Sequence, residues 1–363
     1  MVAESCDMSI SFYKECNGEE EQPLVTICVP TIGRLAYLPE TIKSIQEQTY
    51  QNYEVLILDN ASLMDAVKLF ENYVDVDKRV RIVRSEIRLP MFANFNKGLK
   101  EARGKYISYF HDDDIYLPLY LESLVRFLEN NSSVGLVNSN FEWIKKDGEI
   151  IRSCRPKTCI LSGRRFIGET ILTGTDVFST PGYLYRRAAL MEVEGFDESI
   201  PPEGGDRIIL MRIAENWNVG FVSDLLWKYR GHSMQTSQLI TKVSAIVSYD
   251  KLCDQYLKGL KKRWPAERKF VQKLCWIWMV NRLIRILYAW SISETLDEME
   301  ICLKQLQNVG VPNLILNRLR GEAWLYIRDS FLLSYAFLIL KKIVRSYWVD
   351  TLLKKNLLKE KHR

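Results

Sequence analysis

Residues 106–118 have the sequence YISYFHDDDIYLP, in which a short apolar run precedes three adjacent aspartates and then a proline. The run Tyr106–Phe110 has the length and apolar content of a buried β-strand. Residues Leu117–Glu129 have the apolar spacing of a helix, and Pro118 stands where proline favours a helix start. The stretch predicts a strand, an acidic turn and a helix in succession.

The same alternation of apolar runs and helical stretches extends on both sides. The other predicted elements are strand Leu24–Val29, helix Leu38–Gln48, strand Tyr53–Leu58, helix Asp65–Tyr73, strand Val80–Val83, helix Phe92–Ala102 and a strand beginning at Val134–Val137. Continuous apolar strands that alternate with helices are typical of a parallel, doubly wound α/β sheet.

The alternation becomes less regular beyond residue 150, and strands give way to amphipathic helices beyond residue 240. In the less regular part we predict a strand at Gly182–Arg186 and helices near 187–193 and 205–216. The predicted organisation is an N-terminal extension (1–22), an α/β domain (23–240) and a basic amphipathic helical region (241–363).

The amino-acid composition limits the classes of protein to which the chain can belong. With 47% hydrophobic and 26% charged residues, the 363-residue chain has the makeup of a globular protein with a sizeable core. No cysteine pair has C-x-x-C spacing, which argues against structural zinc and a disulfide framework. The first twenty residues lack the plan of a signal peptide, and the longest clean apolar stretches, of about ten residues, are too short to span a bilayer. We expect a cytoplasmic protein.

Positive charge is concentrated in the rear of the chain. Segment 251–290 has ten Lys or Arg against two acids, and segment 341–363 has eight against two, although the whole chain carries only +5. Basic amphipathic helices with Trp, such as Phe270–Trp290, can lie at the inner face of a membrane and contact anionic lipid. The alternative is ordinary packing of these helices against the α/β domain. No nucleic-acid recognition motif is present, so we expect no nucleic-acid partner.

Polar residues follow each of the first four predicted strands. They are Pro30, Thr31 and Arg34; then Asp59 to Ser62; then Arg84, Ser85 and Arg88; then His111 to Asp114. Because the carboxyl ends of parallel strands meet at one edge, where open sheets bind ligands, these residues predict a polar pocket.

The three aspartates Asp112–Asp114 are the most specific feature of this edge. Adjacent carboxylates repel one another unless a cation or hydrogen bonds offset the repulsion. Oxygen ligands suit Mg²⁺ or Mn²⁺, which in turn hold phosphate oxygens. The alternative is a solvated acidic loop in which Asp114 caps the following helix. No phosphate-binding G-x-x-x-x-G-K-[ST] loop and no G-x-G-x-x-G is present, which disfavours an ATPase or a dinucleotide dehydrogenase.

Several sequence blocks resemble family-2 glycosyltransferases of the GT-A fold. They are Val29–Arg34, Asp59–Ser62, Asn94–Gly104 leading into Tyr106, Asp112–Asp114 with Pro118, Gly195–Glu198, Gly205-Asp206 with Arg212, and Tyr229–His232 with Gln235 and Ser237. The resemblance covers about residues 24–237, and its specificity lies in the order and spacing of the blocks.

The resemblance implies a role for each matching position. Pro30, Thr31 and Arg34 line the nucleotide pocket, and Asp59 accepts a hydrogen bond from a pyrimidine imide, which favours a UDP or dTDP donor. Arg88 lies near the base or diphosphate, and Asp112 serves the ribose. Asp113 and Asp114 bind the metal, His232 completes the metal shell or closes over the diphosphate, and Asp206 is the general base. The activity implied is transfer of a hexosyl or deoxyhexosyl unit to a saccharide acceptor. A lipid-linked acceptor, as in O-antigen or capsule assembly, fits this expectation.

The chain also departs from the family pattern. His111 occupies the first acidic place of the usual D-x-D motif, and we interpret it as packing or hydrogen-bonding beside the metal rather than binding it. Gly205 replaces the first residue of a Glu-Asp pair, and Ile32 replaces an aromatic residue.

One candidate base favours inverting chemistry, because a single carboxylate opposite the leaving group gives inversion. The alternative for Asp206 is a helix N-cap. Two other functions stay open from the sequence: a metal-dependent nucleotidyltransferase, and a catalytically silent scaffold that binds nucleotide sugars.

Overall fold

The computed structural model describes most of the chain outside its two ends. The described residues are 24–34, 36–145, 148, 150–153, 157–173, 182–232, 242–291 and 296–308. The predicted extension 1–22, the basic tail 341–363, Gln235 and Ser237 lie outside them. The chain forms two compact units, which we describe separately. The first comprises Met1–Phe166, Phe178–Ser199 and Ile209–Ser233, and the second comprises Ile167–Val177, Ile200–Ile208 and Met234–Arg363.

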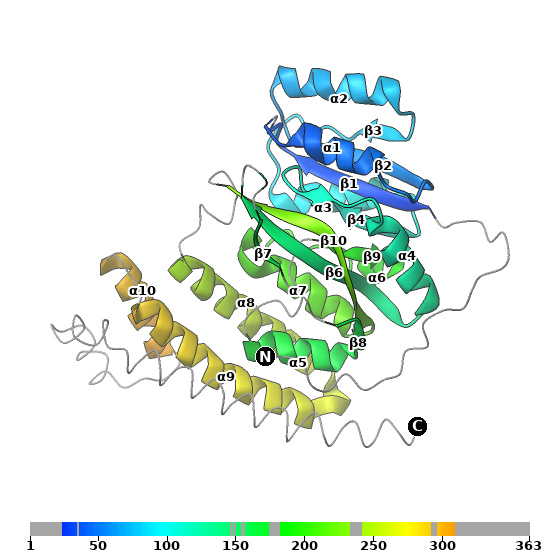
Figure 1. Cartoon of the computed structure of the whole chain (residues 1–363). Helices are drawn as coiled ribbons and strands as arrows, with labels where there is room; N and C mark the ends of the chain where they lie inside the picture. Colours follow the sequence, from blue (N-terminus) through cyan, green and yellow to red (C-terminus); the bar gives the residue numbers. More distant parts are fainter. Residues whose placement is uncertain are drawn as a thin grey trace. The chain divides into compact units, whose positions relative to one another are not determined.

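A mixed β-sheet forms the centre of the first unit (Figure 1). Its described strands are β1 (Val25–Thr31), β2 (Tyr53–Asp59), β3 (Val80–Ile82), β4 (Tyr106–Tyr109), β5 (Ile115–Tyr116), β6 (Val134–Lys145), β7 (Ile150–Ser153), β8 (Cys159–Leu161), β9 (Leu184–Arg186) and β10 (Asn218–Gly231). The strand order is β3-β2-β1-β4-β9-β6-β10-β5, with β7 added to β6 and β8 added to β10.

The first half of the sheet is parallel, as the sequence predicts. Strands β1 to β4 pair in parallel. The helices between and after them are α1 (Leu38–Gln46), α2 (Met64–Val76), α3 (Met91–Glu101) and α4 (Tyr120–Asn130). Helix α4 begins three residues later than predicted because Ile115–Tyr116 pair with β10 and the Leu117 N–H donates to the Leu226 carbonyl. Asp114 therefore does not cap α4, whose N-cap is Leu119.

The second half of the sheet contains pairings that the sequence did not predict. Strand β9 is antiparallel to both β4 and β6, whereas β6 and β10 are parallel to each other. Strand β10 has 14 residues and two register shifts between Val222 and Trp227, with exposed residues at its middle. This interrupted pattern explains why β10 escaped prediction. Helix α6 (Arg187–Glu192) lies in this unit, whereas α5 (Gly163–Thr173) and α7 (Pro202–Ala214) each have residues in both units.

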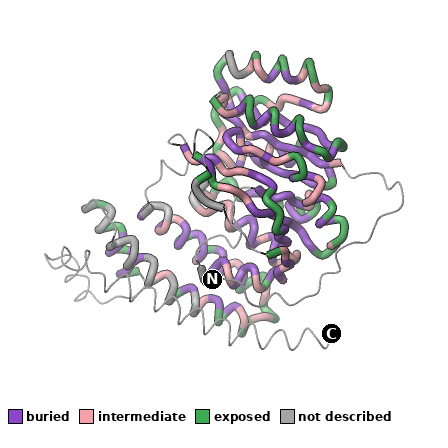
Figure 2. The backbone as a smooth tube through the Cα atoms, viewed as in Figure 1, coloured by how far each residue is buried: buried purple, intermediate pink, exposed green. Residues whose placement is uncertain are grey.

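The core of the first unit lies on the sheet, and the strands are almost continuously buried (Figure 2). Every residue of β2 is buried, as expected for a strand covered on both faces. Trp227, which is fully buried, stacks on Phe141 and Tyr116. Burial of such large aromatic side chains is the main force that stabilises this unit.

The second unit contains the long helices α8 (Lys242–Arg263), α9 (Arg268–Ser291) and α10 (Leu296–Asn308), with a short 3-10 helix, η2 (Pro265–Glu267), between α8 and α9. Helix α9 buries Val271, Leu274 and Trp278 on one face. The Trp278 indole donates to Asp254 of α8 at 2.8 Å. None of the described helices is both long enough and apolar enough to cross a membrane.

Candidate active site

At the carboxyl edge of the parallel strands, β4 ends before β1 and β2 do. Strand β1 pairs with β4 only as far as Cys28, although its pairing with β2 continues to Thr31 opposite Asp59. Pro30, which has no N–H to donate, therefore sits beyond the β4 ladder, where no bond is lost. The residues that follow β1, β2 and β4 are thus exposed to one another at a single edge, as predicted.

Asp112 is a fully buried carboxylate that is neutralised by β1 and the loop after it. The Thr31 hydroxyl donates to Asp112 Oδ2 at 2.6 Å, and the Arg34 guanidinium donates to Oδ1 at 2.5 Å. Gly33 shapes this loop: its φ of +81° favours glycine, and its N–H donates to Thr31 Oγ1 at 2.9 Å. Both Asp112 oxygens already have donors, so Asp112 anchors Arg34 and is less available to a metal than Asp114.

Asp113 joins the ends of β4 and β10. Its Oδ2 lies 2.9 Å from His232 Nε2 and 3.3 Å from the Arg34 guanidinium. The His232 ring lies against Tyr37 with a centroid distance of 4.7 Å. The structure thus brings His232 to the acidic turn, 119 residues away in sequence.

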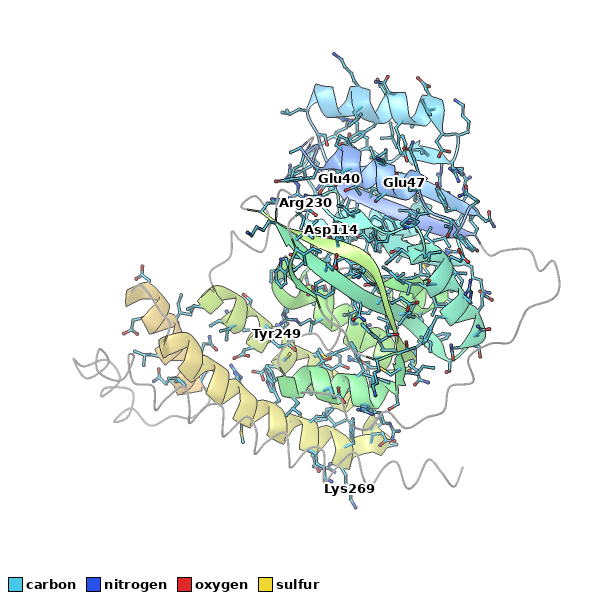
Figure 3. The ribbon with its side chains drawn as sticks, in the orientation of Figure 1. Glu40, Glu47, Asp114, Arg230, Tyr249 and Lys269 are labelled. Atoms are coloured by element: carbon cyan, nitrogen blue, oxygen red, sulfur yellow. The ribbon has the colours of Figure 1, made fainter. Side chains whose placement is uncertain are left out.

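Asp114 is fully buried, and one of its carboxylate oxygens has no hydrogen-bond partner. The Arg230 N–H donates to its Oδ1 at 3.0 Å, while Oδ2 has no hydrogen-bond partner. The Arg230 guanidinium also donates to the Asp113 carbonyl and to Glu40 of α1 (Figure 3). Burial, reinforced by the charge of Asp113, raises the pKa of Asp114 well above its usual value.

A divalent cation fits this turn. Ligand atoms of His111, Asp113 and Asp114 all lie within 4.8 Å of one another. The vacant Asp114 oxygen and the repulsion between neighbouring carboxylates are what a bound cation would relieve. Burial lowers the pKa of His111, against the opposing effect of Asp113 and Asp112, and so favours the neutral imidazole that binds metals. His111, which we interpreted from sequence as a packing residue, therefore has a ligand's position.

The Asp59 side chain forms a second part of the edge. Asp59 is fully buried, its Oδ1 accepts the Ser62 N–H at 2.9 Å, and its Oδ2 is paired with the Arg84 guanidinium. Ala61 has a φ of +57°, an unusual conformation for a residue with a side chain, in the turn that presents this N–H. Arg84 and Arg88 are both exposed, and the observed ion pair with Asp59 is that of Arg84. The role of Arg88 stays a prediction.

Asp206 belongs to the second unit, in α7. Its half-buried side chain accepts the Arg207 N–H at 2.9 Å. The Arg207 guanidinium lies over the Tyr249 ring of α8, 4.7 Å from its centroid. Helix α7 begins at Pro202, so Asp206 is inside the helix and is not its N-cap. The base role of Asp206 stays a prediction.

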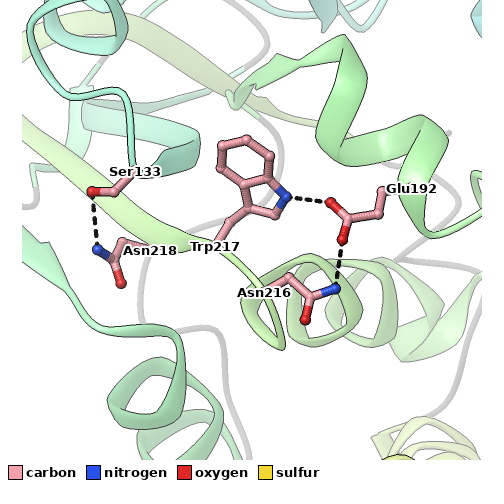
Figure 4. Close-up of a pocket in the computed structure, with 5 residues that line it drawn as sticks. All are labelled: Ser133, Glu192, Asn216, Trp217 and Asn218. Carbon is pink, nitrogen blue, oxygen red and sulfur yellow. Dashed lines mark hydrogen bonds between the residues drawn. The ribbon is translucent and has the colours of Figure 1, made fainter.

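A surface pocket of about 300 Å³ lies elsewhere on the first unit (Figure 4). It is lined by Ser133, Glu192, Asn216, Trp217 and Asn218. Glu192 accepts from the Trp217 indole and the Asn216 amide, each at 2.7 Å. Because Ser133 and Asn218 stand at the beginnings of β6 and β10, this pocket is at the amino edge of the sheet. The candidate site is at the opposite edge.

Sequence reasoning placed Arg84 at the polar edge without giving it a role, and it gave no role to Glu40 or Arg230. Arg84 had a signal, because it follows β3 directly and an arginine is a natural partner for a buried carboxylate. Arg230 belongs to a block that resembles the family, but its side-chain contact with Glu40 spans 190 residues and leaves no local sequence signal.

Comparisons with known proteins agree with this architecture. The family model described as "Glycosyl transferase family 2" matches residues 26–193. The chain is 26% identical to an uncharacterized glycosyltransferase of Methanocaldococcus jannaschii, over 76% of this chain and 91% of that protein. It is 33% identical to an uncharacterized glycosyltransferase of Haemophilus influenzae, over 37% of this chain and 42% of that protein.

Two solved structures share the fold. Staphylococcus aureus TarS 1–349, in complex with UDP-GlcNAc, aligns over 90% of this chain and 91% of that one, with a TM-score of 0.62 and 17% identity. The mannosyltransferase PcManGT of Pyrobaculum calidifontis, in complex with GDP-Man and Mn²⁺, aligns over 89% of this chain and 86% of that one, with a TM-score of 0.51 and 15% identity. At these identities the likeness concerns the fold, which is GT-A.

Proposed function

We propose, because residues 26–193 match the model of glycosyl transferase family 2, that the chain transfers a sugar with inversion from a nucleoside-diphosphate donor to a hydroxyl of a saccharide acceptor. The coarser part of this statement, glycosyl transfer from a nucleotide sugar, follows from the family and its relatives. Inversion, the donor base and the acceptor are our proposals.

The observation that supports the proposal is that the three adjacent aspartates have different contacts. Asp112 is tied to Thr31 and Arg34, whereas Asp114 keeps a vacant buried oxygen beside Asp113. Asp112 thus fixes a cationic side chain at the edge, and Asp114 keeps an oxygen available for a cation next to Asp113. A diphosphate needs both kinds of positive charge, since no glycine-rich phosphate loop is present.

Donor binding falls to residues of β1, β2 and β4. We place the diphosphate near Arg34 and the pyrimidine base near Asp59, whose Ser62 and Arg84 contacts hold the carboxylate in place. UDP and dTDP sugars are therefore our preferred donors. We assign Mg²⁺ or Mn²⁺ to Asp113 and Asp114, with His111 or His232 completing the set. When bound, such an ion stabilises the charge that develops on the leaving diphosphate.

Asp206 is our candidate general base. A sugar hydroxyl is a poor nucleophile, so a carboxylate within hydrogen-bond reach must accept its proton as the new bond to the anomeric carbon forms. The bond from that carbon to the diphosphate breaks on the opposite side, which gives inversion. The basic charge of the second unit supports an acceptor linked to lipid, as in surface polysaccharide assembly at the inner face of a membrane.

Release of nucleoside diphosphate from a panel of UDP, dTDP and GDP sugars, with Mn²⁺ and candidate saccharide acceptors, tests the reaction. We expect release from the wild type and a loss of roughly 10²-fold or more in Asp206→Asn, with donor binding retained. Asp224→Asn, an exposed aspartate on β10, is the matched control. Donor binding without release would instead support the scaffold, and pyrophosphate as product would support the nucleotidyltransferase.

A further inference from the structure

The turn between α8 and α9 carries a dense group of cations. Residues 258–273, which we call the basic turn, contain seven Lys or Arg and a single acid, Glu267. The seven cations are all exposed: Lys258, Lys261, Lys262, Arg263, Arg268, Lys269 and Lys273. Except for Arg263, none of their side chains forms a hydrogen bond or an ion pair with a described residue. Lys269, labelled in Figure 3, points away from the helices.

Helix stability explains only half of this arrangement. Lys261, Lys262 and Arg263 lie in the last turn of α8, where the helix dipole favours positive charge. Arg268 and Lys269 begin α9, whose first turn contains no acid, and there the dipole disfavours positive charge. Arg268 and Lys269, placed at the start of α9 and next to the three cations that end α8, raise the free energy of the isolated protein through repulsion. An anionic partner would reverse that effect.

Aromatic side chains accompany these cations. Trp264 and Phe270 are half-buried, and their ring centroids lie 6.1 Å apart. Amphipathic aromatic side chains beside Lys and Arg are typical of surfaces that rest at the headgroup level of a bilayer. A soluble anion without apolar groups would contact the cations but would gain little from the aromatic rings.

We propose that the basic turn is a docking surface for a bilayer containing anionic phospholipid. The lipid headgroups contact the cations of both helix ends, and Trp264 and Phe270 lie at the interface. This locates the contact at residues 258–273. The stretch Phe270–Trp290 favoured by the sequence instead buries Val271, Leu274 and Trp278 inside the unit. The inference does not depend on the proposed reaction.

Sedimentation of the full chain with vesicles tests the proposal. The vesicles are phosphatidylcholine alone or phosphatidylcholine mixed with phosphatidylglycerol, at increasing NaCl. We expect binding only to the mixed vesicles, weakening as salt screens the charges. Arg268→Gln with Lys269→Gln should weaken binding about 30-fold, since each cation near an anionic surface contributes roughly fivefold.

The control is Lys78→Gln with Lys100→Gln, two exposed lysines of the first unit, which makes the same change in net charge. It should bind the mixed vesicles like the wild type. Circular dichroism verifies that both variants are folded. Equal binding by the Arg268/Lys269 variant and the wild type would overturn the proposal, as would equal binding to both vesicle types. Failure to bind vesicles together with tight, salt-sensitive binding of DNA would assign the surface to nucleic acid instead. Donor turnover without vesicles should be unchanged in both variants.

Discussion

The backbone N–H of Arg230 holds one oxygen of the buried Asp114 carboxylate, and the other oxygen has no partner. A cation bound there should stabilise the folded protein, by roughly 2.7 kcal/mol when its concentration is about 100 times Kd. We expect Mn²⁺ to raise the Tm of the wild type, and Asp113→Asn to abolish most of the increase. Differential scanning fluorimetry with Mn²⁺ and with chelator measures this. Asp75→Asn, an exposed aspartate on α2, should respond like the wild type. If Mn²⁺ raised the Tm of all three proteins equally, the Asp113–Asp114 turn would not be the metal site.

Arg84, rather than Arg88, should control nucleotide binding through Asp59. Arg84→Met leaves the fully buried Asp59 carboxylate with only the Ser62 N–H among its observed partners, and so disturbs the group that we assign to the base. We expect affinity for UDP to fall about 10-fold or more, the usual effect of losing a charge-assisted contact. Isothermal titration calorimetry measures the affinity. Arg88→Met should lower the affinity for UDP less than Arg84→Met does. A larger loss in Arg88→Met would assign the nucleotide contact to Arg88, as the family pattern implies. Arg126→Met on α4 controls for the lost charge.

The sequence predicted the parallel half of the sheet because its strands and helices are local features. Apolar runs such as Tyr53–Leu58 are continuous, and each is followed by a helix, so periodicity alone identifies them. The antiparallel strand β9 and the long strand β10 depend on which distant residues pair. Leu225 and its exposed neighbours at the middle of β10 break the apolar pattern, so the strand has no clear local signal.

The position of the candidate site could be predicted from the sequence, but the contacts between its side chains could not. The edge of the sheet places Asp59 and Asp112–Asp114 together, whatever their side-chain rotamers. Which aspartate is neutralised and which keeps a vacant oxygen depends on Arg34, His232 and Arg230, and no sequence spacing specifies those contacts. The pairing of Arg84 with Asp59 has the same origin, since Arg84 and Arg88 both follow β3 and no sequence spacing shows which of them reaches the carboxylate.

Glu54, at the beginning of β2, should make stability depend on pH. Burial alone would raise its pKa, but hydrogen bonds from the Arg103 N–H, the Thr26 hydroxyl and Arg81 outweigh burial and lower it. A carboxylate with a lowered pKa stabilises the protein above its unfolded pKa of about 4.3. That stabilisation is lost as pH falls through the folded value.

Replacing Glu54 with glutamine should therefore cost roughly 1–3 kcal/mol at pH 7. The difference from the wild type should shrink below about pH 4, where the wild-type carboxylate takes up a proton. Urea denaturation at both pH values measures the free energy of unfolding. Glu122→Gln on the surface of α4 should have little effect at either pH. A cost for Glu54→Gln that stays constant with pH would show that packing, and not the charge, is responsible.

Arg230 should act as a positioning residue for the acidic turn. Its guanidinium links the Asp113 carbonyl to Glu40 on α1, and it is almost fully buried. Arg230→Gln loses the Glu40 ion pair and shortens the reach to the Asp113 carbonyl, while the backbone bond to Asp114 can persist. Contacts that orient metal ligands contribute about 10- to 100-fold in metal affinity. We therefore expect weaker Mn²⁺ binding with a smaller change in UDP affinity.

The variant Glu40→Gln separates the two effects of Arg230. It removes only the ion pair, whose acidic partner is half-exposed, so it should change Mn²⁺ affinity much less than Arg230→Gln does. Calorimetric titration of both variants with Mn²⁺, followed by UDP, supplies the comparison. If Glu40→Gln weakened Mn²⁺ binding as much as Arg230→Gln, the ion pair would be what holds the turn. If neither did, the turn would be rigid without Arg230, and its guanidinium would only close the gap between α1 and β10.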